Sequence, residues 1–443
     1  MSAIREAATV VLVRNPSEPE VFWVRRAPTQ RFLGGFHAFP GGVREKTDAT
    51  VEAAAARELR EEAGVDLDPS VLQPAGRWLT PPFGSIRFDT RFYVAAMPDD
   101  QMAHWAEGEL DAGEWIRPSE ALALWERAEA LLAPPTLHAL RCLAEGSADV
   151  ARRMAAPAEA SRGDVTRIEL VRGVFTLPLR TPTLPPATHT NTVIFAGERA
   201  IVIDPATPHS DEQVRLDGLL DVLRAEGVEI AEIVLTHHHA DHVAYADALR
   251  RRLRVPIAAH DETAHRLDFP VDRRIGEGES WDLGRGRSAR AVHTPGHTRG
   301  HLAVLEEGTR TLAAGDLVAG ASYVVVDPDD GGDMAAYLAS LRKARALGVR
   351  LMLPAHGPMF ASAAADAKLD EYVSHRLARE AQVLQAVQGG AATVETILPV
   401  AYSDTPTAMW PLAASSLRAH LAKLVGDGVV KIDAGAYLAV TVR

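Results

Sequence analysis

Histidine and aspartate residues gather in the second half of the chain in a pattern that predicts metal binding. His237, His239, Asp241 and His242 form the sequence His-x-His-x-Asp-His directly after the expected strand end 233–236. In an extended loop, residues two apart point the same way, so we expect His237 and His239 to hold one ion. Asp241 and His242 then turn back to a second ion. Open α/β sheets commonly place their sites at such carboxyl ends of strands.

Three further candidate ligands follow other short apolar runs: His297, Asp316 and His356. Imidazole and carboxylate suit Zn2+, and two ions sharing a site would use all seven ligands, with Asp316 as the bridging carboxylate. A lone histidine is more often a structural or surface residue. Eight of the 17 histidines, however, fall in the segments 237–242, 293–301 and 356, which favours a metal site.

These segments carry the motifs of a known superfamily. The histidine pattern, Thr-Pro-Gly-His at His297, Gly-Asp at Asp316 and Pro-x-His-Gly at His356 resemble the metallo-β-lactamase superfamily over about residues 165–372. The resemblance implies an αββα sandwich in which two Zn2+ ions activate water for attack on an ester, thioester, lactone, amide or phosphodiester. It also makes Asp241 a catalytic residue as well as a ligand.

Neighbouring residues have roles that the sequence leaves partly open. Asp204, in Val-Ile-Asp-Pro, matches an early aspartate of the superfamily that is usually structural. His238, His293 and His301 either support the ligands from behind or are plain structural residues. The downstream segment 371–376 and the tail are similar to the β-lactamase-like branch that includes a single-stranded-RNA endoribonuclease.

Three glutamates on one expected helix form a second candidate metal site. The segment 51–63 is strongly helical, and Glu58 lies three and four residues before Glu61 and Glu62, so the side chains converge. Close carboxylates repel one another unless a cation lies between them, and such oxygen ligands suit Mg2+ or Mn2+ bridging to phosphate. A solvated acidic helix face is the alternative. Gly64 is a suitable end for the helix.

The sequence around these glutamates resembles the Nudix box. It reads Arg-Glu-Leu-Arg-Glu-Glu-Ala-Gly-Val and follows Phe-Pro-Gly-Gly. The resemblance covers about residues 5–140 and implies an α/β/α sandwich that hydrolyses a diphosphate linked to another moiety. It implies that all three glutamates bind the metal ion and that Glu61 and Glu62 are catalytic. The substrate-binding residues that it implies are Gly41, Gly42 and Arg57.

The box departs from its usual length. Counted from Gly42, the loop to Arg57 is one residue longer than usual, so the glutamate that precedes the helix falls on Ala49, with Glu45 and Asp48 as near substitutes. The helix glutamates remain, so we expect metal binding to survive. Two segments are similar to the coenzyme A-type Nudix branch and imply coenzyme A or an acyl derivative as substrate: 31–38 and 87–93.

Alternating strands and helices predict a mixed α/β (α+β) chain. We expect a Nudix-like domain over 1–145, a linker over 146–164, a metallo-β-lactamase fold over 165–372 and a winged-helix-like module over 373–443. The helices expected in the first two domains are 51–63, 118–132, 136–144, 211–226 and 241–253. The strands expected there are 9–13, 21–25, 88–95, 192–195, 200–203, 230–235, 302–305 and 311–314.

The C-terminal module is expected to combine helices at 372–387 and 415–424 with strands at 429–432 and 436–440. Residues 376–443 carry six basic and five acidic side chains, whereas a winged helix that reads nucleic acid usually has a stronger basic stripe. We therefore favour packing or dimerisation over RNA contact for this module. The oligomeric state stays open.

Composition narrows the classes of protein. The net charge of -12 weakens broad affinity for nucleic acid, and the single cysteine, Cys142, excludes an intramolecular disulfide and zinc sites of several thiolates. The chain has no run of 18 or more apolar residues, so we expect no membrane span. A strand-like segment at 7–13 stands where a signal peptide would be, which predicts a cytoplasmic protein.

These patterns together predict a bifunctional hydrolase of small molecules, with a Zn2+ site and a separate Mg2+ or Mn2+ site. One alternative is a zinc-dependent endonuclease of single-stranded RNA. Another is that the Nudix-like domain senses a nucleotide as a regulatory module and no longer hydrolyses it.

Overall fold

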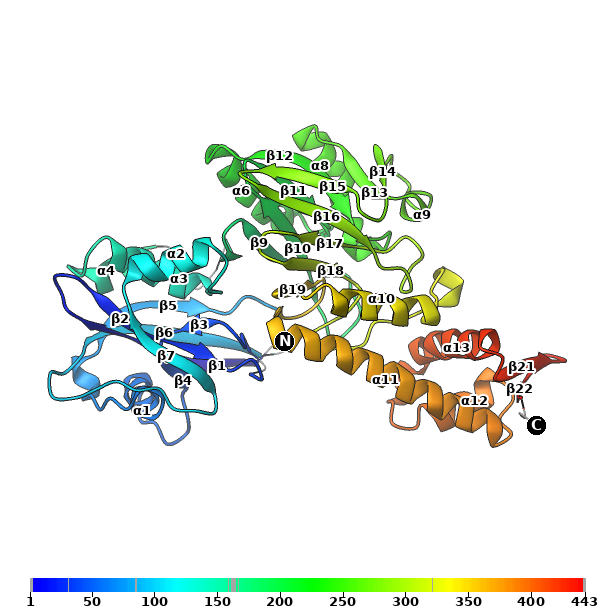
Figure 1. Cartoon of the computed structure of the whole chain (residues 1–443), viewed down its shortest axis with the longest axis horizontal. Helices are drawn as coiled ribbons and strands as arrows, with labels where there is room; N and C mark the ends of the chain where they lie inside the picture. The colour runs from blue at the N-terminus through cyan, green and yellow to red at the C-terminus, as the bar shows by residue number, and fades with distance from the viewer. Residues whose placement is uncertain are drawn as a thin grey trace.

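A computed structural model describes residues 3–440, except 31, 84–85, 158, 161–164, 166 and 321. Its three regions follow one another along the chain from blue to red in Figure 1. The N-terminal region contains one sheet, the middle region contains a pair of sheets, and the C-terminal region contains a two-stranded ribbon. Some of the expected linker, 158 and 161–164, and the first residue of the segment 31–38 lie outside the described residues.

One mixed sheet forms the frame of the N-terminal region. Its central strand β1 (Ala3–Arg14) pairs parallel with β6 (Ile86–Ala96) and antiparallel with β2 (Glu20–Arg26). Both faces of these strands bury apolar side chains, because α1 (Val51–Ala63) covers one face and three other helices cover the opposite one. This is the α/β/α sandwich that the Nudix resemblance implies. The other elements are β3 (His37–Ala38), β4 (Gly41–Val43), η1 (Pro69–Val71), β5 (Gln73–Leu79), β7 (Leu110–Ile116), α2 (Pro118–Glu126), α3 (Pro134–Ala144) and α4 (Val150–Ala155).

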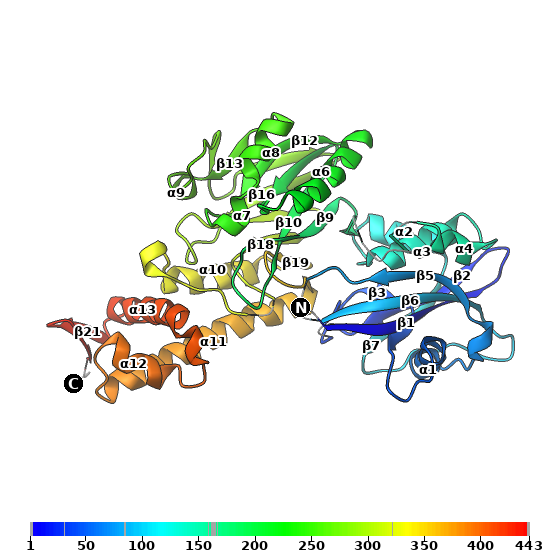
Figure 2. The same cartoon turned by 180° about the vertical axis from the view of Figure 1, so that it is seen from behind.

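Two facing sheets form the middle region, with helices on both outer faces (Figure 2). Apolar side chains of both sheets meet between them. Helices α6 (Ser210–Ala225) and α8 (Ala246–Leu253) cover the first sheet, and α10 (Met334–Ala346) and α11 (Ser362–Gln388) cover the second. The expected αββα sandwich is therefore confirmed.

The first of these sheets has the order β14-β13-β12-β11-β10-β9-β8, and the second runs from β15 to β20 in sequence order. The strands of the first sheet are β8 (Glu169–Val171), β9 (Val174–Arg180), β10 (His189–Ala196), β11 (Arg199–Ile203), β12 (Glu229–Leu235), β13 (Ile257–His260) and β14 (Arg273–Ile275). Those of the second are β15 (Ser280–Gly284), β16 (Arg287–His293), β17 (Leu302–Glu306), β18 (Thr311–Gly315), β19 (Leu351–Pro354) and β20 (Phe360–Ala361). Short elements between them are α7 (Ala240–Val243), α9 (Asp261–Ala264) and η2 (Pro328–Asp330).

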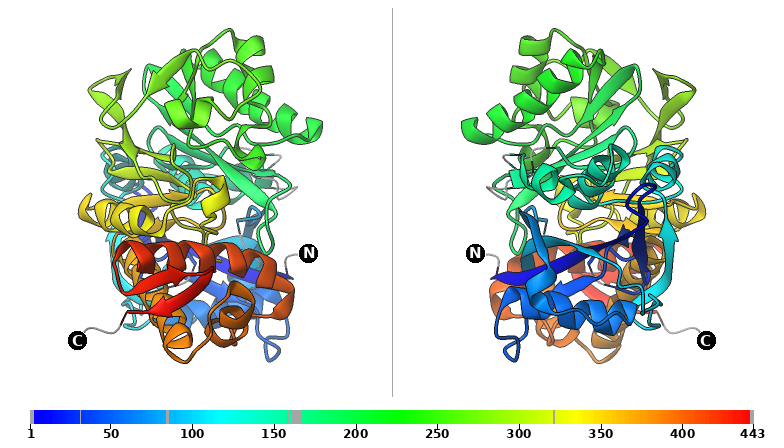
Figure 3. Two further views of the ribbon diagram at one scale, coloured as in Figure 1. Left: turned by 90° about the vertical axis from the view of Figure 1, so that its right-hand side faces the viewer. Right: turned by 90° about the vertical axis from the view of Figure 1, so that its left-hand side faces the viewer.

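The C-terminal module packs its own small core between helices and a β-ribbon. Helix α11 passes through the expected boundary at 372/373, so it contributes to both the middle region and this module. Helix α13 lies alongside α11 in Figures 1 and 3 and also contacts α10. The remaining elements are α12 (Val394–Ala401), η3 (Thr407–Met409), α13 (Trp410–Gly426), β21 (Val430–Asp433) and β22 (Ala436–Ala439). Within the described ranges, no helix combines the length and apolarity that crossing a membrane requires.

Two helices expected in the first two domains differ from the structure, and the helix expected at 372–387 begins earlier, at Ser362. The helix expected at 241–253 is wrong as one element, because the backbone N–H of Tyr245 donates to Pro205 O (3.0 Å) and the chain turns between α7 and α8. The helix expected at 118–132 ends at Glu126. There, Ala128 adopts a positive φ, and the backbone N–H of Leu132 bonds across to Leu170 of β8 (3.2 Å).

Candidate functional site

The seven candidate zinc ligands lie shortly after strands of both sheets. His237 and His239 follow β12, and Asp241 and His242 lie on α7 directly after them. The ends of these strands meet at one edge of the sandwich, which brings together residues more than 100 positions apart in the sequence. The remaining three ligands follow β16, β18 and β19: His297, Asp316 and His356.

Four of these side chains form one group. The ligand atoms of His237, His239, His297 and Asp316 all lie within 4.8 Å of one another. Nδ1 of His239 is 2.9 Å from Nε2 of His237 and 3.0 Å from Nε2 of His297, and Asp316 Oδ2 is 3.6 Å from Nε2 of His297. Three ring nitrogens this close together make a suitable cradle for one cation.

Asp241, His242 and His356 form a second group within the same distance limit. Asp316 Oδ1 faces this group, 3.5 Å from Nε2 of His242 and 3.3 Å from Nε2 of His356. The two oxygens of Asp316 therefore face different groups. This is the geometry that a bridging carboxylate needs.

Each of the five histidines places one ring nitrogen beside an oxygen outside the cluster and turns the other nitrogen inward. Outer hydrogen bonds of this kind set the tautomer and leave a lone pair for a metal ion. The outer pairs are His237 Nδ1 with Thr236 Oγ1 (3.0 Å), His239 Nε2 with Asp330 Oδ2 (2.6 Å), His242 Nδ1 with Asp204 Oδ2 (2.8 Å), His297 Nδ1 with Val325 O (2.8 Å) and His356 Nδ1 with His189 O (3.1 Å).

Two buried atoms at the centre of the cluster have no hydrogen-bond partner among the described residues: His242 Nε2 and Asp316 Oδ1. Buried polar atoms are nearly always partnered, so an unpartnered pair in one place indicates a missing charged ligand. A divalent cation would satisfy both atoms. The set of imidazole nitrogens and carboxylate oxygens fits Zn2+.

The electrostatics of the cluster suit a cation. Burial disfavours a charged His242, but the carboxylates of Asp316 and Asp204 outweigh it and raise the pKa of His242 to about 10. Burial lowers the pKa of His297 to about 4, so that ring is neutral. Burial raises the pKa of Asp316, yet the nearby histidines, first His356, hold it well below its usual range. A metal ion would therefore meet an ionised carboxylate and would displace a proton from His242.

Asp204 supports the cluster from behind. Its buried carboxylate accepts hydrogen bonds from the backbone N–H of Thr236 (2.8 Å), from Thr236 Oγ1 (2.7 Å) and from His242 Nδ1. The ring of His301 is also buried, and its Nε2 accepts from the backbone N–H of Asp316 (3.0 Å). Both residues therefore orient ligands. His293 instead stacks on His260, with 4.5 Å between ring centroids.

Sequence reasoning missed Asp330. This residue of η2 accepts hydrogen bonds from both His238 (3.1 Å) and the candidate ligand His239. Arg266 donates to Asp330 Oδ1, the oxygen that also accepts from His238. About 90 residues separate Asp330 from the histidine motif, and no spacing pattern links them, so only the folded chain reveals the contact.

The glutamates of the N-terminal region surround an arginine. Arg57 donates to Glu58 (3.0 Å) and to Glu61 (2.9 Å), and it forms two hydrogen bonds with Asp48 (3.1 and 3.0 Å). Glu62 instead accepts from the backbone N–H of Gly41 (2.8 Å). Asp48, one of the near substitutes in the long loop, thus supplies the carboxylate that Ala49 lacks.

These glutamates do not form a compact ligand group like the histidines. Among the residues that the structure describes, their oxygens are absent from the sets of three ligand atoms lying within 4.8 Å of one another. Burial raises the pKa of Glu62 to about 7. Burial also raises the pKa of Glu58, although the charge of Arg57 opposes this shift. A Cβ at Gly42 would lie 2.4 Å from Glu58 Oε1, so glycine lets the loop approach these carboxylates.

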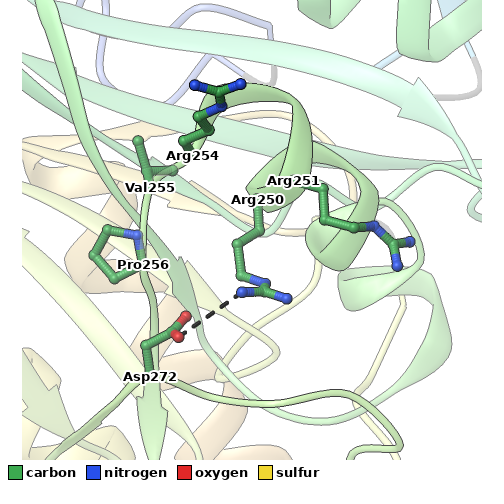
Figure 4. A pocket seen from close by; sticks show the side chains of 6 residues that line it. All are labelled: Arg250, Arg251, Arg254, Val255, Pro256 and Asp272. Atoms are coloured by element: carbon green, nitrogen blue, oxygen red, sulfur yellow. Dashed lines mark ion pairs between the residues drawn. The ribbon is translucent and has the colours of Figure 1, made fainter.

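A surface hollow near the C-terminal end of α8 involves none of the candidate ligands. Figure 4 shows Arg250 directed toward Asp272, with 3.9 Å between Nη1 and Oδ1. This hollow is therefore separate from the metal cluster. Its other lining residues are Arg251, Arg254, Val255 and Pro256.

Comparisons with known proteins match all three regions of the chain. Residues 184–356 match the family described as "Metallo-beta-lactamase superfamily", residues 4–134 match "NUDIX domain", and residues 393–436 match "Beta-lactamase associated winged helix domain". The Beta-lactamase-like protein 2 homolog of Drosophila melanogaster is 30% identical over 264 residues, which are 56% of this chain and 86% of that protein. The homolog of Caenorhabditis elegans is 29% identical, covering 55% of this chain and 80% of its own.

Solved structures share the fold. A beta-lactamase domain protein from Burkholderia ambifaria has a TM-score of 0.54 and 21% identity, and covers 62% of this chain and 93% of its own. A metallo-beta-lactamase family protein from Thermus thermophilus has a TM-score of 0.50 and 21% identity, and covers 61% and 100%. With the His/Asp cluster described above, these findings identify a hydrolase. The chain belongs to the metallo-β-lactamase superfamily, joined to an N-terminal Nudix domain and a C-terminal winged-helix module.

Proposed function

We propose that the metallo-β-lactamase domain is a dinuclear zinc hydrolase that cleaves an ester, a thioester or a phosphodiester. The observation that carries this proposal is the position of Asp316, whose two oxygens face two separate ligand groups while Oδ1 has no partner among the described residues. His237, His239 and His297 would hold one ion. Asp241, His242 and His356 would hold the other, with Asp316 shared.

Bound there, two Zn2+ ions would supply Lewis acidity and a water of lowered pKa. The chain's own residues prepare this chemistry in two ways. The outer hydrogen bonds of the histidines direct their lone pairs inward, as Asp204 does for His242. Asp241 Oδ2 lies 3.5 Å from His356 Nε2, so its carboxylate can hold or move a proton at the same edge of the site.

The test is metal analysis combined with a substrate panel. Wild type is expected to hold two Zn2+ per chain and to hydrolyse at least one of three chromogenic probes: a nitrophenyl ester, a thioester or a phosphodiester. His239→Ala is expected to lose this activity and zinc. His265→Ala is the matched control, because this exposed histidine lies outside the cluster. A wild type that stays without zinc under zinc-replete conditions contradicts the proposal.

We infer further that the Nudix domain is a Mg2+- or Mn2+-dependent diphosphate hydrolase acting on a coenzyme A-like substrate. The raised pKa values of the partly buried Glu58 and Glu62 support it, because a divalent cation would relieve the cost of removing these carboxylates from water. Incubation of the full chain with coenzyme A and Mg2+ is expected to release the two halves of the diphosphate. Glu61→Gln is expected to abolish this release, whereas His239→Ala keeps it; silence of wild type on coenzyme A rejects this substrate class.

A second candidate for the zinc site is cleavage of single-stranded RNA, with the Nudix domain as a nucleotide sensor. The contact between α13 of the winged module and η2, beside the metal cluster, supports it. The net charge of -12 weighs against it. Catalytic cleavage of single-stranded RNA that His239→Ala abolishes would favour this candidate, and calorimetry showing nucleotide binding without turnover would favour the sensor.

A further inference from the structure

The loop segment 324–330, here called the bridging segment, touches the metal cluster from one side. His297 Nδ1 donates to the backbone carbonyl of Val325 (2.8 Å). Nε2 of His239 lies 2.6 Å from Asp330 Oδ2, so its proton is shared with a carboxylate and Nδ1 is left facing the cluster. Two of the three imidazoles in the first ligand group are therefore oriented by this one segment.

The C-terminal module holds the bridging segment from the other side. Ser415 Oγ on α13 donates to Asp327 Oδ2 (2.9 Å), and Arg418 Nη2 donates to Asp327 Oδ1 (3.4 Å) and to Asp329 Oδ2 (3.1 Å). The backbone N–H of Val326 donates to another α13 hydroxyl (3.4 Å). The segment is thus fastened by side chains that lie about 90 residues further along the chain.

Asp327, which accepts hydrogen bonds from two side chains of α13, also builds the turn that carries Asp330. Asp327 Oδ1 accepts from the backbone N–H of Asp329 (3.1 Å), and the carbonyl of Asp327 accepts from the backbone N–H of Gly332 (2.7 Å). Gly331 follows with a φ of 82°, which closes η2. A displacement of Asp327 would therefore displace Asp330 and its contact with His239.

We propose that the C-terminal module is a positioning element of the metal centre, and that Asp330 is the positioning residue through which it acts on His239. The contacts run in series from Arg418 and Ser415 to Asp327, through η2 to Asp330, and on to the imidazole. This inference rests on the proposed function, because it assigns a role toward the first of the two zinc sites. It gives the winged-helix module a task that needs neither nucleic acid nor a second subunit.

The experiment measures Zn2+ affinity by competition with a chromophoric chelator, together with the visible absorption spectrum of the Co2+-substituted full chain. Asp330→Ala is expected to lower the affinity for one of the two ions by about 10- to 100-fold, as loss of an outer carboxylate does in other metal sites. Asp330→Asn keeps an oxygen acceptor and is expected to retain more of the affinity. The absorption bands should change in intensity, because the ring of His239 changes its orientation.

Arg418→Ala combined with Ser415→Ala tests the link to the module at a distance from the ligands. This double variant is expected to lower the affinity for the same ion by about two- to fivefold, which is the scale of partly exposed ion pairs. Lys423→Ala is the matched control, because it removes ion pairs to Glu380 and Asp427 from the same helix without touching the bridging segment. It is expected to leave the affinity and the spectrum unchanged.

The outcomes separate this inference from the proposal on which it rests. A wild type that binds no Zn2+ overturns the proposed function and this inference together. If wild type binds two ions and both Asp330→Ala and the α13 double variant keep wild-type affinity and spectrum, this inference alone is overturned. An effect of Lys423→Ala as large as that of the double variant also overturns it, because general loosening of the module would then explain the result.

Discussion

Substitution of Asp204 by asparagine separates the support of the metal cluster from the support of the fold. In the wild type, one carboxylate oxygen accepts from the backbone N–H of Thr236, and the other accepts from the hydroxyl of Thr236 and from Nδ1 of His242. The side chain of Asp204 is only 4% exposed, so water cannot replace these bonds. Asparagine keeps the first acceptor and places an NH2 group where the second oxygen was.

The exchange disfavours the proton on Nδ1 of His242. The hydroxyl of Thr236 can rotate to accept from the new NH2 group, but Nδ1 of His242 can accept only if it gives up its proton, which leaves the proton of the ring on Nε2, the nitrogen that faces Asp316. Loss of a hydrogen bond to a charged acceptor costs about 1.5–3 kcal/mol, so the free energy of unfolding is expected to fall by about 2–3 kcal/mol. Affinity for the ion of the second group is expected to fall by about 10- to 100-fold.

The free energy of unfolding of the metal-free protein should reveal the same residue through its pH dependence. The pKa of His242 is raised from 6.5 to about 10, so its charged form stabilises the fold fully below pH 6.5, and this contribution is lost as the pH rises through about 10. Asp204→Asn removes part of that attraction. Its deficit relative to wild type is therefore expected to be full at about pH 6.5 and to shrink as the pH rises toward 10.

Urea unfolding of the metal-free proteins and chelator competition measure the two effects separately. Asp217→Asn is the control, because it makes the same chemical change at a partly buried carboxylate that accepts from Tyr245 away from the cluster. Retention of both Zn2+ ions at wild-type affinity by Asp204→Asn would refute the tautomer argument. An equal loss of zinc in Asp217→Asn would refute its specificity.

Three further predictions concern packing and the Nudix glutamates. Gly296→Ala should lower the free energy of unfolding, measured by urea unfolding, by more than about 2 kcal/mol, because the added Cβ would lie 2.3 Å from the backbone of α10. Gly108→Ala is the control, because Gly108 has nearly the same φ (132° against 135°) but open space around it, and this change should lower the free energy of unfolding clearly less. Glu62→Gln should stabilise the metal-free protein above pH 7 and have little effect below pH 4.5. The reason is that the pKa of Glu62 is raised from 4.5 to about 7, so the cost of its charge grows as the pH rises from 4.5 to 7. An equal gain in stability at pH 4 and pH 8 contradicts this. Asp48→Ala should leave Arg57 without its double hydrogen bond and lower the melting temperature by several degrees, as differential scanning calorimetry would show, and an unchanged melting temperature would refute a supporting role for this loop residue.

Local patterns in the sequence were enough to predict the main helices and strands of this protein. The helix expected at 51–63 has those same bounds in the structure, because Thr50 caps its first turn and Gly64 can take the left-handed conformation that ends it. The histidine and aspartate motifs followed apolar runs, and strand ends of one sandwich edge meet in space. Residue type and spacing therefore predicted the fold class and the candidate ligands.

Long-range contacts decided the rest. The chain between α7 and α8 turns because the backbone N–H of Tyr245 donates to the carbonyl of Pro205, which no helical periodicity can reveal. Asp48, and not Ala49, meets Arg57, because the extra loop residue changes which side chain points inward. Asp330 reaches His239, and α13 reaches Asp327, across about 90 residues. Sequence spacing describes only neighbours along the chain, whereas the orientation of a ligand depends on groups that tertiary packing brings to its outer side.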